Sequence, residues 1–226
     1  MIELLEQRDG ESAKQYVTRV LVYNIVYIHL EPGEKIVEQD LCAQFHNSRT
    51  PIREALLELS RNRLIDIFPK RGTYVSYIDP GLVEEIRHLR SVLESELAVM
   101  ACDVLTATEI DRLRENIAVW QYYIGKRQEK KIFELDKRFH AMLYEMCSRN
   151  YWYELVASAA PHFDRTTILS FRCRNTEKIL SDHAQLVDAI EEKDKERAYT
   201  IARKHMQRYS ENLGAMKDAY PKYFKK

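Results

Sequence analysis

Apolar residues recur every three or four positions through the first sixty residues, which is the spacing of one buried helical face. The pattern predicts a first helix over residues 12–30, ended by Pro32-Gly33, and a short second helix over 38–45. A third helix is predicted over 49–62, with Pro51 in its first turn, where a missing N–H is tolerated. The apolar faces of these helices are formed by Val17, Val20, Leu21, Ile25 and Ile28, by Leu41, Cys42 and Phe45, and by Ile52, Ala55, Leu56 and Leu59.

A turn and a hairpin complete this part of the chain. His46-Asn47-Ser48 predicts a break between the second and third helices, because Asn tolerates left-handed backbone and Ser is a good N-cap. Residues 64–78 hold β-forming side chains on both sides of Pro69-Lys70-Arg71-Gly72, which predicts two strands joined by a turn. Asp79-Pro80 then ends the unit, since proline pushes the preceding residue out of helical backbone. Three helices and a β-hairpin are the plan of a winged helix-turn-helix, assigned here to residues 1–78.

From residue 81 onward the helical spacing continues and no strand pattern recurs. Six helical stretches are predicted, over residues 81–104, 107–126, 131–147, 151–173, 177–191 and 194–217. Thr106 and Glu109 form a capping box at the start of the second stretch. The fold class is therefore mainly α: residues 79–226 are predicted to form an all-helical antiparallel bundle of six helices, or seven with one more short helix.

Composition narrows the class of protein. The 35 basic and 35 acidic residues cancel, and 45% of residues are hydrophobic, as in an ordinary folded domain. No apolar run approaches the roughly 20 residues of a membrane helix, and the acidic start does not resemble a signal peptide. The four cysteines are scattered without a CxxC pair, which excludes a cysteine-built zinc finger. We therefore expect a cytoplasmic protein that makes no contact with a membrane.

Basic residues gather in the predicted second half of the winged unit. Residues 44–75 hold six Lys or Arg against three acids, whereas residues 1–43 hold four against eight. A local basic segment on a neutral protein is compatible with DNA contact through one face, although chance clustering gives the same count.

The motifs of this segment resemble the DNA-binding domain of GntR-type bacterial transcription regulators. The run Ser-Arg-Thr-Pro-x-Arg-Glu-Ala-Leu at residues 48–56 is the most specific, and the one departure is His46-Asn47, where the family has a Gly-hydrophobic pair. The helical remainder is similar to the FCD ligand-binding domain of the FadR branch of that family. The matching positions are Leu30, Pro32, Gly33, Leu41, Ser48, Arg49, Thr50, Pro51, Arg53, Glu54, Ala55, Leu56, Leu59, Leu64, Arg71, Gly72 and Val75.

The resemblance implies a double-stranded operator DNA as partner. Arg49 and Arg53 share one face of the third helix, and an Arg fork can bind guanine O6 and N7. The hydroxyls of Ser48 and Thr50 at the helix N-terminus suit phosphates, and the resemblance assigns groove contact to the wing at Arg71-Gly72. The alternative for Arg53 is an ion pair with Glu54 or an acid of the second helix. One short helix reads few bases, so we expect a homodimer on a two-fold operator.

Four residues of the bundle have the composition of a metal site. Asp136 and His140 are four apart and project from one helical face, while His183 and His205 each lie about 11 residues from the break near Asp194. A hairpin of the last two helices would bring these two histidines level, and three imidazoles with one carboxylate suit zinc, nickel or manganese. Taken alone, the spacing favours ordinary half-buried histidines over metal ligands. The resemblance favours the metal, because a subset of the FCD family has Asp-x3-His and the two later histidines at these positions.

The resemblance also implies a small carboxylate effector bound in the bundle. Arg90 with Glu94 matches the family's Arg-x3-Glu, and a guanidinium fork fits a carboxylate, although the two residues can equally form an i, i+4 ion pair. His162 is a further candidate for contact with the effector, although a structural role is favoured for it. Arg172 and Arg174 could also reach the effector, but they suit the C-terminus of their own helix electrostatically as well.

The function that follows is transcription regulation, not catalysis, with DNA affinity controlled by an organic acid at a metal-containing bundle. The rival hypotheses are a metal-dependent enzyme on a helical bundle and an acyl-CoA sensor of the same family without a metal. Left open by the sequence are the effector, the operator, the metal, the number of bundle helices, and whether the protein represses or activates.

Overall fold

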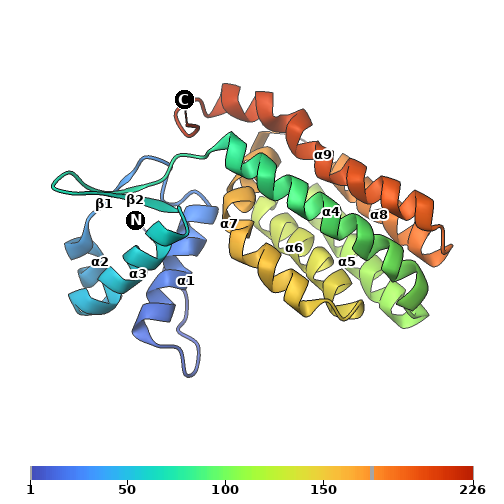
Figure 1. Cartoon of the computed structure of the whole chain (residues 1–226), viewed down its shortest axis with the longest axis horizontal. Coiled ribbons are helices and arrows are strands. Elements are labelled where there is room, and N and C mark those ends of the chain that lie inside the picture. The colour runs from blue at the N-terminus through green and yellow to red at the C-terminus, as the bar shows by residue number, and fades with distance from the viewer. Residues whose placement is uncertain (1, 174–175, 226) are drawn as a thin grey trace. The chain divides into compact units, whose positions relative to one another are not determined.

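The computed structural model describes residues 2–173 and 176–225 and divides into two compact units. One unit comprises the chain up to Pro80 together with the segment from Tyr220 onward, and the other is Gly81–Ala219. Figure 1 shows the first unit with its helices and short sheet, and the second as helices alone. The described residues include no helix long and apolar enough to cross a membrane.

Three helices pack together in the first unit, as predicted: α1 (Ala13–Val26), α2 (Glu38–Phe45) and α3 (Arg49–Arg61). Helix α1 begins at a capping box between Ser12 and Gln15 and ends earlier than the predicted residue 30. Its end is set by Ile28, whose backbone is left-handed with φ 59°, and by the N–H groups of His29 and Leu30, which both donate to the Asn24 carbonyl. The three helices enclose one apolar core, in which the predicted residues Val17, Leu21, Ile25, Ile52 and Leu59 are fully buried.

The turn between α2 and α3 differs from the expectation in one detail. His46, not Asn47, takes the left-handed conformation (φ 51°, ψ 39°) and ends α2. The Asn47 side chain instead donates to the Phe45 carbonyl at 2.9 Å. Ser48 does stand at the N-cap of α3 with extended backbone, but its hydroxyl makes no capping hydrogen bond.

The predicted hairpin is present, and a third strand that was not predicted pairs with it. Strands β2 (Ile65–Phe68) and β3 (Gly72–Val75) pair antiparallel, with Ile65 opposite Val75 and Phe68 opposite Gly72. A third strand, β1 (Lys35–Ile36), pairs antiparallel with β3, so the sheet order is β1-β3-β2. Gly72 has φ 120°, a conformation that other residues rarely adopt, which explains a glycine at this point of the wing.

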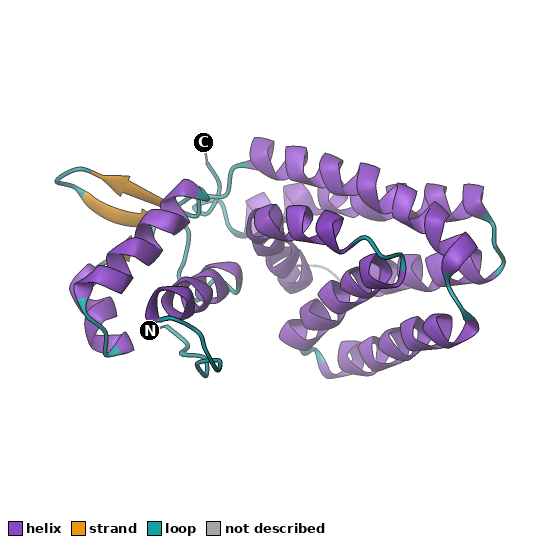
Figure 2. Cartoon of the chain, turned by 60° about the horizontal axis from the view of Figure 1, so that its bottom comes forward, coloured by secondary structure: helices purple, strands orange, loops and turns teal. Residues whose placement is uncertain are grey.

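The second unit is a bundle of six helices within the described residues, which resolves the choice between six and seven. They are α4 (Pro80–Val104), α5 (Ala107–Lys126), α6 (Glu129–Met146), α7 (Asn150–Cys173), α8 (Glu177–Glu191) and α9 (Lys195–Ala219). The predicted Thr106–Glu109 capping box starts α5. Helix α5 packs on α6 and α8, and α9 packs on α7 and α8. Figure 2 shows short loops joining these helices.

The chain beyond α9 groups with the first unit and not with the bundle unit. Phe224 forms a parallel bridge with Ile78, and both side chains are buried. The Ile78 N–H donates to the Tyr223 carbonyl at 2.8 Å, and the Lys225 N–H donates to the Ile78 carbonyl at 2.8 Å. The Lys225 ammonium also pairs with Asp79 at 3.0 Å. We call residues 220–225 the C-terminal tail.

Candidate functional site

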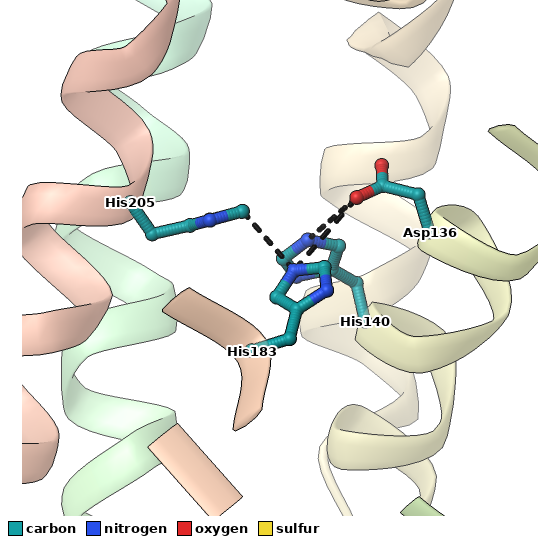
Figure 3. Close-up of side chains that lie close together, drawn as sticks. All are labelled: Asp136, His140, His183 and His205. Carbon is teal, nitrogen blue, oxygen red and sulfur yellow. Dashed lines mark hydrogen bonds and ion pairs between the residues drawn. The ribbon is translucent and has the colours of Figure 1, made fainter. Parts of the chain in front are cut away.

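The four residues singled out as metal ligands meet in the bundle. Asp136 and His140 come from α6, His183 from α8 and His205 from α9, and one ligand atom of each lies within 4.8 Å of all the others (Figure 3). His183 Nε2 is 3.3 Å from His205 Nε2 and 3.7 Å from Asp136 Oδ1. His140 Nε2 is 3.8 Å from Asp136 Oδ1. The spacing along α6 and the hairpin of α8 and α9 thus produce the cluster that the sequence predicts.

The cluster fits a divalent metal ion in both donor type and spacing. Ligands at about 2.0–2.1 Å in a tetrahedron lie about 3.3 Å from one another, and the three separations given above are 3.3, 3.7 and 3.8 Å, so a small inward shift of the side chains would complete the site. His183 is fully buried, with its ring stacked on Phe139 at 4.2 Å between centroids. Burial, then the neighbouring imidazoles of His205 and His140, lowers the pKa of His183 well below its ordinary value. Its imidazole is therefore neutral, which is the form that binds metal.

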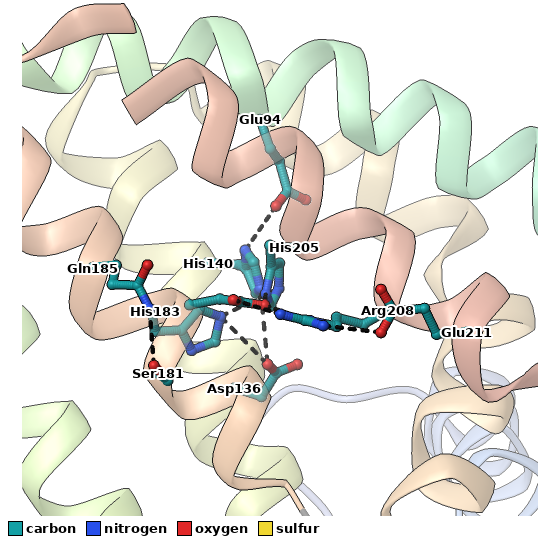
Figure 4. A network of polar contacts seen from close by, with 10 residues as sticks. Glu94, Asp136, His140, Ser181, His183, Gln185, His205, Arg208 and Glu211 are labelled. Atoms are coloured by element: carbon teal, nitrogen blue, oxygen red, sulfur yellow. Dashed lines mark hydrogen bonds and ion pairs between the residues drawn. The ribbon is translucent and has the colours of Figure 1, made fainter. Parts of the chain in front are cut away.

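Carboxylates outside the cluster hold two of its histidines. Glu94 Oε2 lies 2.7 Å from His140 Nδ1 (Figure 4). Its Oε1 accepts from Arg90 Nε at 2.8 Å. Burial opposes ionisation of Glu94, but Arg90 and His140 outweigh it and hold its pKa well below the usual range. A carboxylate on the second ring nitrogen fixes the orientation of a ligating histidine and leaves Nε2 for the ion.

A second outer carboxylate, Asp182, was not predicted from the sequence. Its Oδ2 lies 3.8 Å from His205 Nδ1, and both its oxygens accept from the Arg208 guanidinium, at 2.8 and 2.9 Å. Burial opposes ionisation of Asp182, but His205 and Arg208 outweigh it and lower its pKa to about 2. The signal available in the sequence was weak: Asp182 precedes His183 directly, and Arg208 follows His205 by one helical turn.

Two cavities adjoin the cluster, and Arg90, Asp136 and His140 line both of them. The first cavity lies among α7, α8 and α9 and adds Thr166, Ser170 and other residues to its walls. The second is bounded by α4, α6 and α7.

Arg90 is the predicted effector contact that the structure brings to the cavities. Its side chain is buried, lies over the Phe163 ring at 4.9 Å, and forms the i, i+4 ion pair with Glu94 that was the alternative reading. His162 is buried beside Arg165, and Arg172 is exposed; neither lines the two cavities. Arg174 lies outside the described residues.

The predicted DNA-contacting residues lie on the surface of the first unit. Ser48, Arg49 and Thr50 are exposed at the start of α3. Arg53 is exposed too, and its Nε donates to both carboxylate oxygens of Glu38 on α2 at 2.9 Å, which is the ion pair considered as its alternative. At the wing, the Arg71 guanidinium lies over the Phe68 ring at 5.4 Å, beside Gly72.

A winged helix-turn-helix with an exposed, basic third helix, followed by a helical bundle with a buried His/Asp cluster, is the architecture of a DNA-binding transcription regulator. Comparison with family models agrees: residues 14–75 match the bacterial regulatory proteins of the gntR family, and residues 85–208 match the FCD domain. The chain belongs to the GntR family of transcription regulators, with an FCD C-terminal domain, and not to a family of enzymes.

Relatives are similar over nearly the whole chain. The HTH-type transcriptional repressor RspR of Escherichia coli (strain K12) is 26% identical over 215 residues, which cover 95% of this chain and 94% of that protein. The Nta operon transcriptional regulator of Aminobacter aminovorans is 26% identical over 86% of this chain and 94% of its own. Among solved structures, E. coli McbR/YncC superposes with a TM-score of 0.76 at 22% identity, covering 93% of this chain and 99% of that one, so the two share a fold.

Proposed function

We propose that the chain is a homodimeric regulator whose affinity for a two-fold operator is set by a small carboxylate effector, bound beside a divalent metal ion in the bundle. The observation that carries the proposal is the position of Arg90, which lines both cavities together with the cluster residues Asp136 and His140. An anion entering either cavity would therefore meet a guanidinium and the metal centre together. Repression is the proposed mode, because the similar protein RspR is named a repressor.

The chain's own residues would divide the work of holding the ion and the effector. Asp136, His140, His183 and His205 would hold the metal, which supplies a Lewis-acidic position for a carboxylate oxygen. Arg90, oriented by Glu94 through its Nε, would hold the carboxylate through its remaining N–H donors. Glu94 also contacts His140, so the guanidinium and one metal ligand share a single carboxylate. A change in how the effector is bound would therefore be transmitted through Glu94 to both α4 and α6.

Ser48, Arg49, Thr50 and Arg53, with Arg71 and Gly72 of the wing, would contact the operator. Arg53 would exchange its ion pair with Glu38 for a base or a phosphate. An exposed ion pair contributes little to stability, so breaking it is a small cost against a bidentate contact with guanine.

The experiment starts from full-length protein purified without a nickel column. Its metal content is measured, and DNA that it retains is selected from a random pool. Small carboxylates are then titrated into the metal-loaded complex. We expect stoichiometric metal and at least one acid that changes DNA affinity tenfold or more. Arg90→Lys, which keeps the charge but loses the fork, should weaken that response, whereas Arg87→Lys on the same helix should not. Metal-free protein whose DNA binding ignores every acid would refute the proposal.

A further inference from the structure

The second cavity has polar walls that the metal centre does not use. Beyond the shared Arg90, Asp136 and His140, it is lined by Lys137, Tyr144, Tyr153, Asp164 and the apolar side chains of α7. We call it the Tyr144 cavity. Because Arg90 lines this cavity too, a small molecule inside it lies beside the same guanidinium.

Tyr144 brings a buried hydroxyl to this cavity. The residue is 1% exposed, and its Oη has no hydrogen-bond partner among the described residues. Native structures rarely leave a buried hydroxyl unsatisfied, so the group indicates a missing partner. Burial raises the pKa of Tyr144, and the hydroxyl therefore remains protonated and can donate.

Asp164 supplies an acceptor in the same cavity. Its carboxylate is 4% exposed, and Oδ2 accepts from the ammonium of Lys137, whose side chain is 41% exposed. Burial raises the pKa of Asp164, and the Lys137 ammonium opposes that rise. In either protonation state the carboxyl group keeps acceptor positions that this single bond does not fill.

The charges of the cavity determine which group fits. Glu94 is paired with Arg90 and His140, Asp164 is paired with Lys137, and Asp136 belongs to the metal cluster. A further charged group would enter without a counterion, which is costly in a buried site. A neutral hydroxyl group finds both a donor and an acceptor here, because it can accept a hydrogen bond from Tyr144 and donate one to Asp164.

We infer that the Tyr144 cavity binds a hydroxyl group of the effector, so that the regulator responds to a hydroxylated carboxylic acid. This inference rests on the proposed function, in which the carboxylate of the same molecule lies at Arg90 and the metal centre. Tyr144 and Asp164 then determine specificity, since a site built for a hydroxyl discriminates strongly against the analogue that lacks it.

The test compares acids that differ only in hydroxylation: malate with succinate, lactate with propionate, and gluconate with hexanoate. Binding to the zinc-loaded full chain is measured by calorimetry. We expect at least one hydroxylated acid to bind tenfold or more tightly than its partner. Tyr144→Phe should reduce its affinity to that of the deoxy acid and leave the deoxy acid unaffected. Asp164→Asn should also reduce the preference, and Tyr122→Phe, at an exposed tyrosine of α5, should not.

The outcomes separate the inference from the proposed function. If acids bind at Arg90 but hydroxylation makes no difference, or if Tyr144→Phe keeps the full preference, the inference is wrong and the proposed function stands. If no carboxylate binds the zinc-loaded wild type, both fail. Melting temperature and zinc content establish that Tyr144→Phe is folded; should it not be, the wild-type preference and Asp164→Asn decide the question.

Discussion

His183 and His205 lie 22 residues apart in the chain, and their Nε2 atoms lie 3.3 Å apart in the bundle. The relationship follows from the hairpin of α8 and α9, because residues equidistant from its turn lie at the same height. Two imidazole nitrogens that face each other at this distance repel one another through their lone pairs, unless a proton or a cation lies between them. Substituting one of these two histidines is therefore the most direct test of the candidate metal site.

Removing His183 should abolish metal binding and the stability that metal confers. A ligand specific for the folded state adds about 2.7 kcal/mol at a hundredfold excess over its Kd. We expect chelation to lower the Tm of wild type, His183→Ala to lose both the metal and the chelator sensitivity, and His88→Ala, at an exposed histidine of α4, to retain them. Calorimetry with and without chelator, together with elemental analysis, measures this. A His183→Ala protein that retains stoichiometric metal would contradict the assignment of the four ligands.

Trp120 should report metal binding by its fluorescence. Its indole is fully buried, and the ring centroid lies 4.9 Å from that of His183. A paramagnetic ion such as Ni²⁺ or Cu²⁺ at the cluster should quench this emission, whereas Zn²⁺ should not. Trp152→Phe removes the other tryptophan and isolates the signal. Quenching that persists in Trp152→Phe/His183→Ala would place the bound ion elsewhere.

The exposed arginines of α3 should contribute to DNA affinity but not to the stability of the fold. Arg49→Ala and Arg53→Ala should each weaken binding to the selected DNA by roughly 1–3 kcal/mol if they are bidentate to guanine. Circular dichroism should not change, because both side chains are exposed. Glu38→Gln separates the two roles of Arg53: it breaks the ion pair on α2 but should leave DNA binding intact or stronger. Tight binding by the double arginine variant would show that another surface reads the operator.

Cysteine reactivity should divide the four thiols into two classes. Burial raises the pKa of Cys147 to about 11 and also raises that of Cys102, while Cys42 and Cys173 are half-buried. At pH 8 only about one Cys147 thiol in a thousand is ionised, and the thiolate is the reactive form. A thiol reagent should therefore label Cys42 and Cys173 first in native protein and all four after denaturation. Rapid labelling of Cys147 in the native state would contradict its burial.

The same shift predicts a loss of stability in alkali. The pKa of Cys147 is raised in the folded state, so its contribution is complete below the ordinary value of 9.0 and is lost as the pH rises from there through about 11. Cys147→Ala should flatten this part of the pH–stability profile, as measured by denaturant unfolding. An unchanged slope between pH 9 and 11 would assign the loss to other groups.

Much of the fold and of the candidate metal site could be predicted, because both rest on helical periodicity. Asp136 and His140 share a face by spacing alone, and the α8–α9 hairpin fixes the height of His183 and His205. What could not be predicted depends on how helices rotate against one another. The contact of Asp182 with His205, and the place of Tyr144 in a cavity wall, have no periodic signal.

Other differences arise where segments are too short to show a pattern. The two residues of β1 give no alternation, so only their pairing with β3 identifies them as a strand. The left-handed residue of the helix-turn-helix is His46 although the neighbouring asparagine has the better intrinsic preference, because the helix ends one residue earlier. The C-terminal tail is short and rich in charged and aromatic residues, and nothing in its composition indicates that Phe224 pairs with Ile78.

The pairing of Phe224 with Ile78 makes the DNA-binding unit discontinuous in sequence. The chain leaves that unit at Pro80 and returns to it at Tyr220, so the whole sensor bundle is an insertion between two adjacent backbone segments. A DNA-binding fragment cut after residue 80 would lack the buried Phe224 side chain, and Phe224→Ala should destabilise the unit by about 3–5 kcal/mol, as measured by denaturant unfolding. Helix α4, which carries Arg90, begins beside Ile78, and α9, which carries His205, ends just before the C-terminal tail that pairs with this residue. The bundle is therefore connected to the DNA-binding unit through both of its ends, near Ile78.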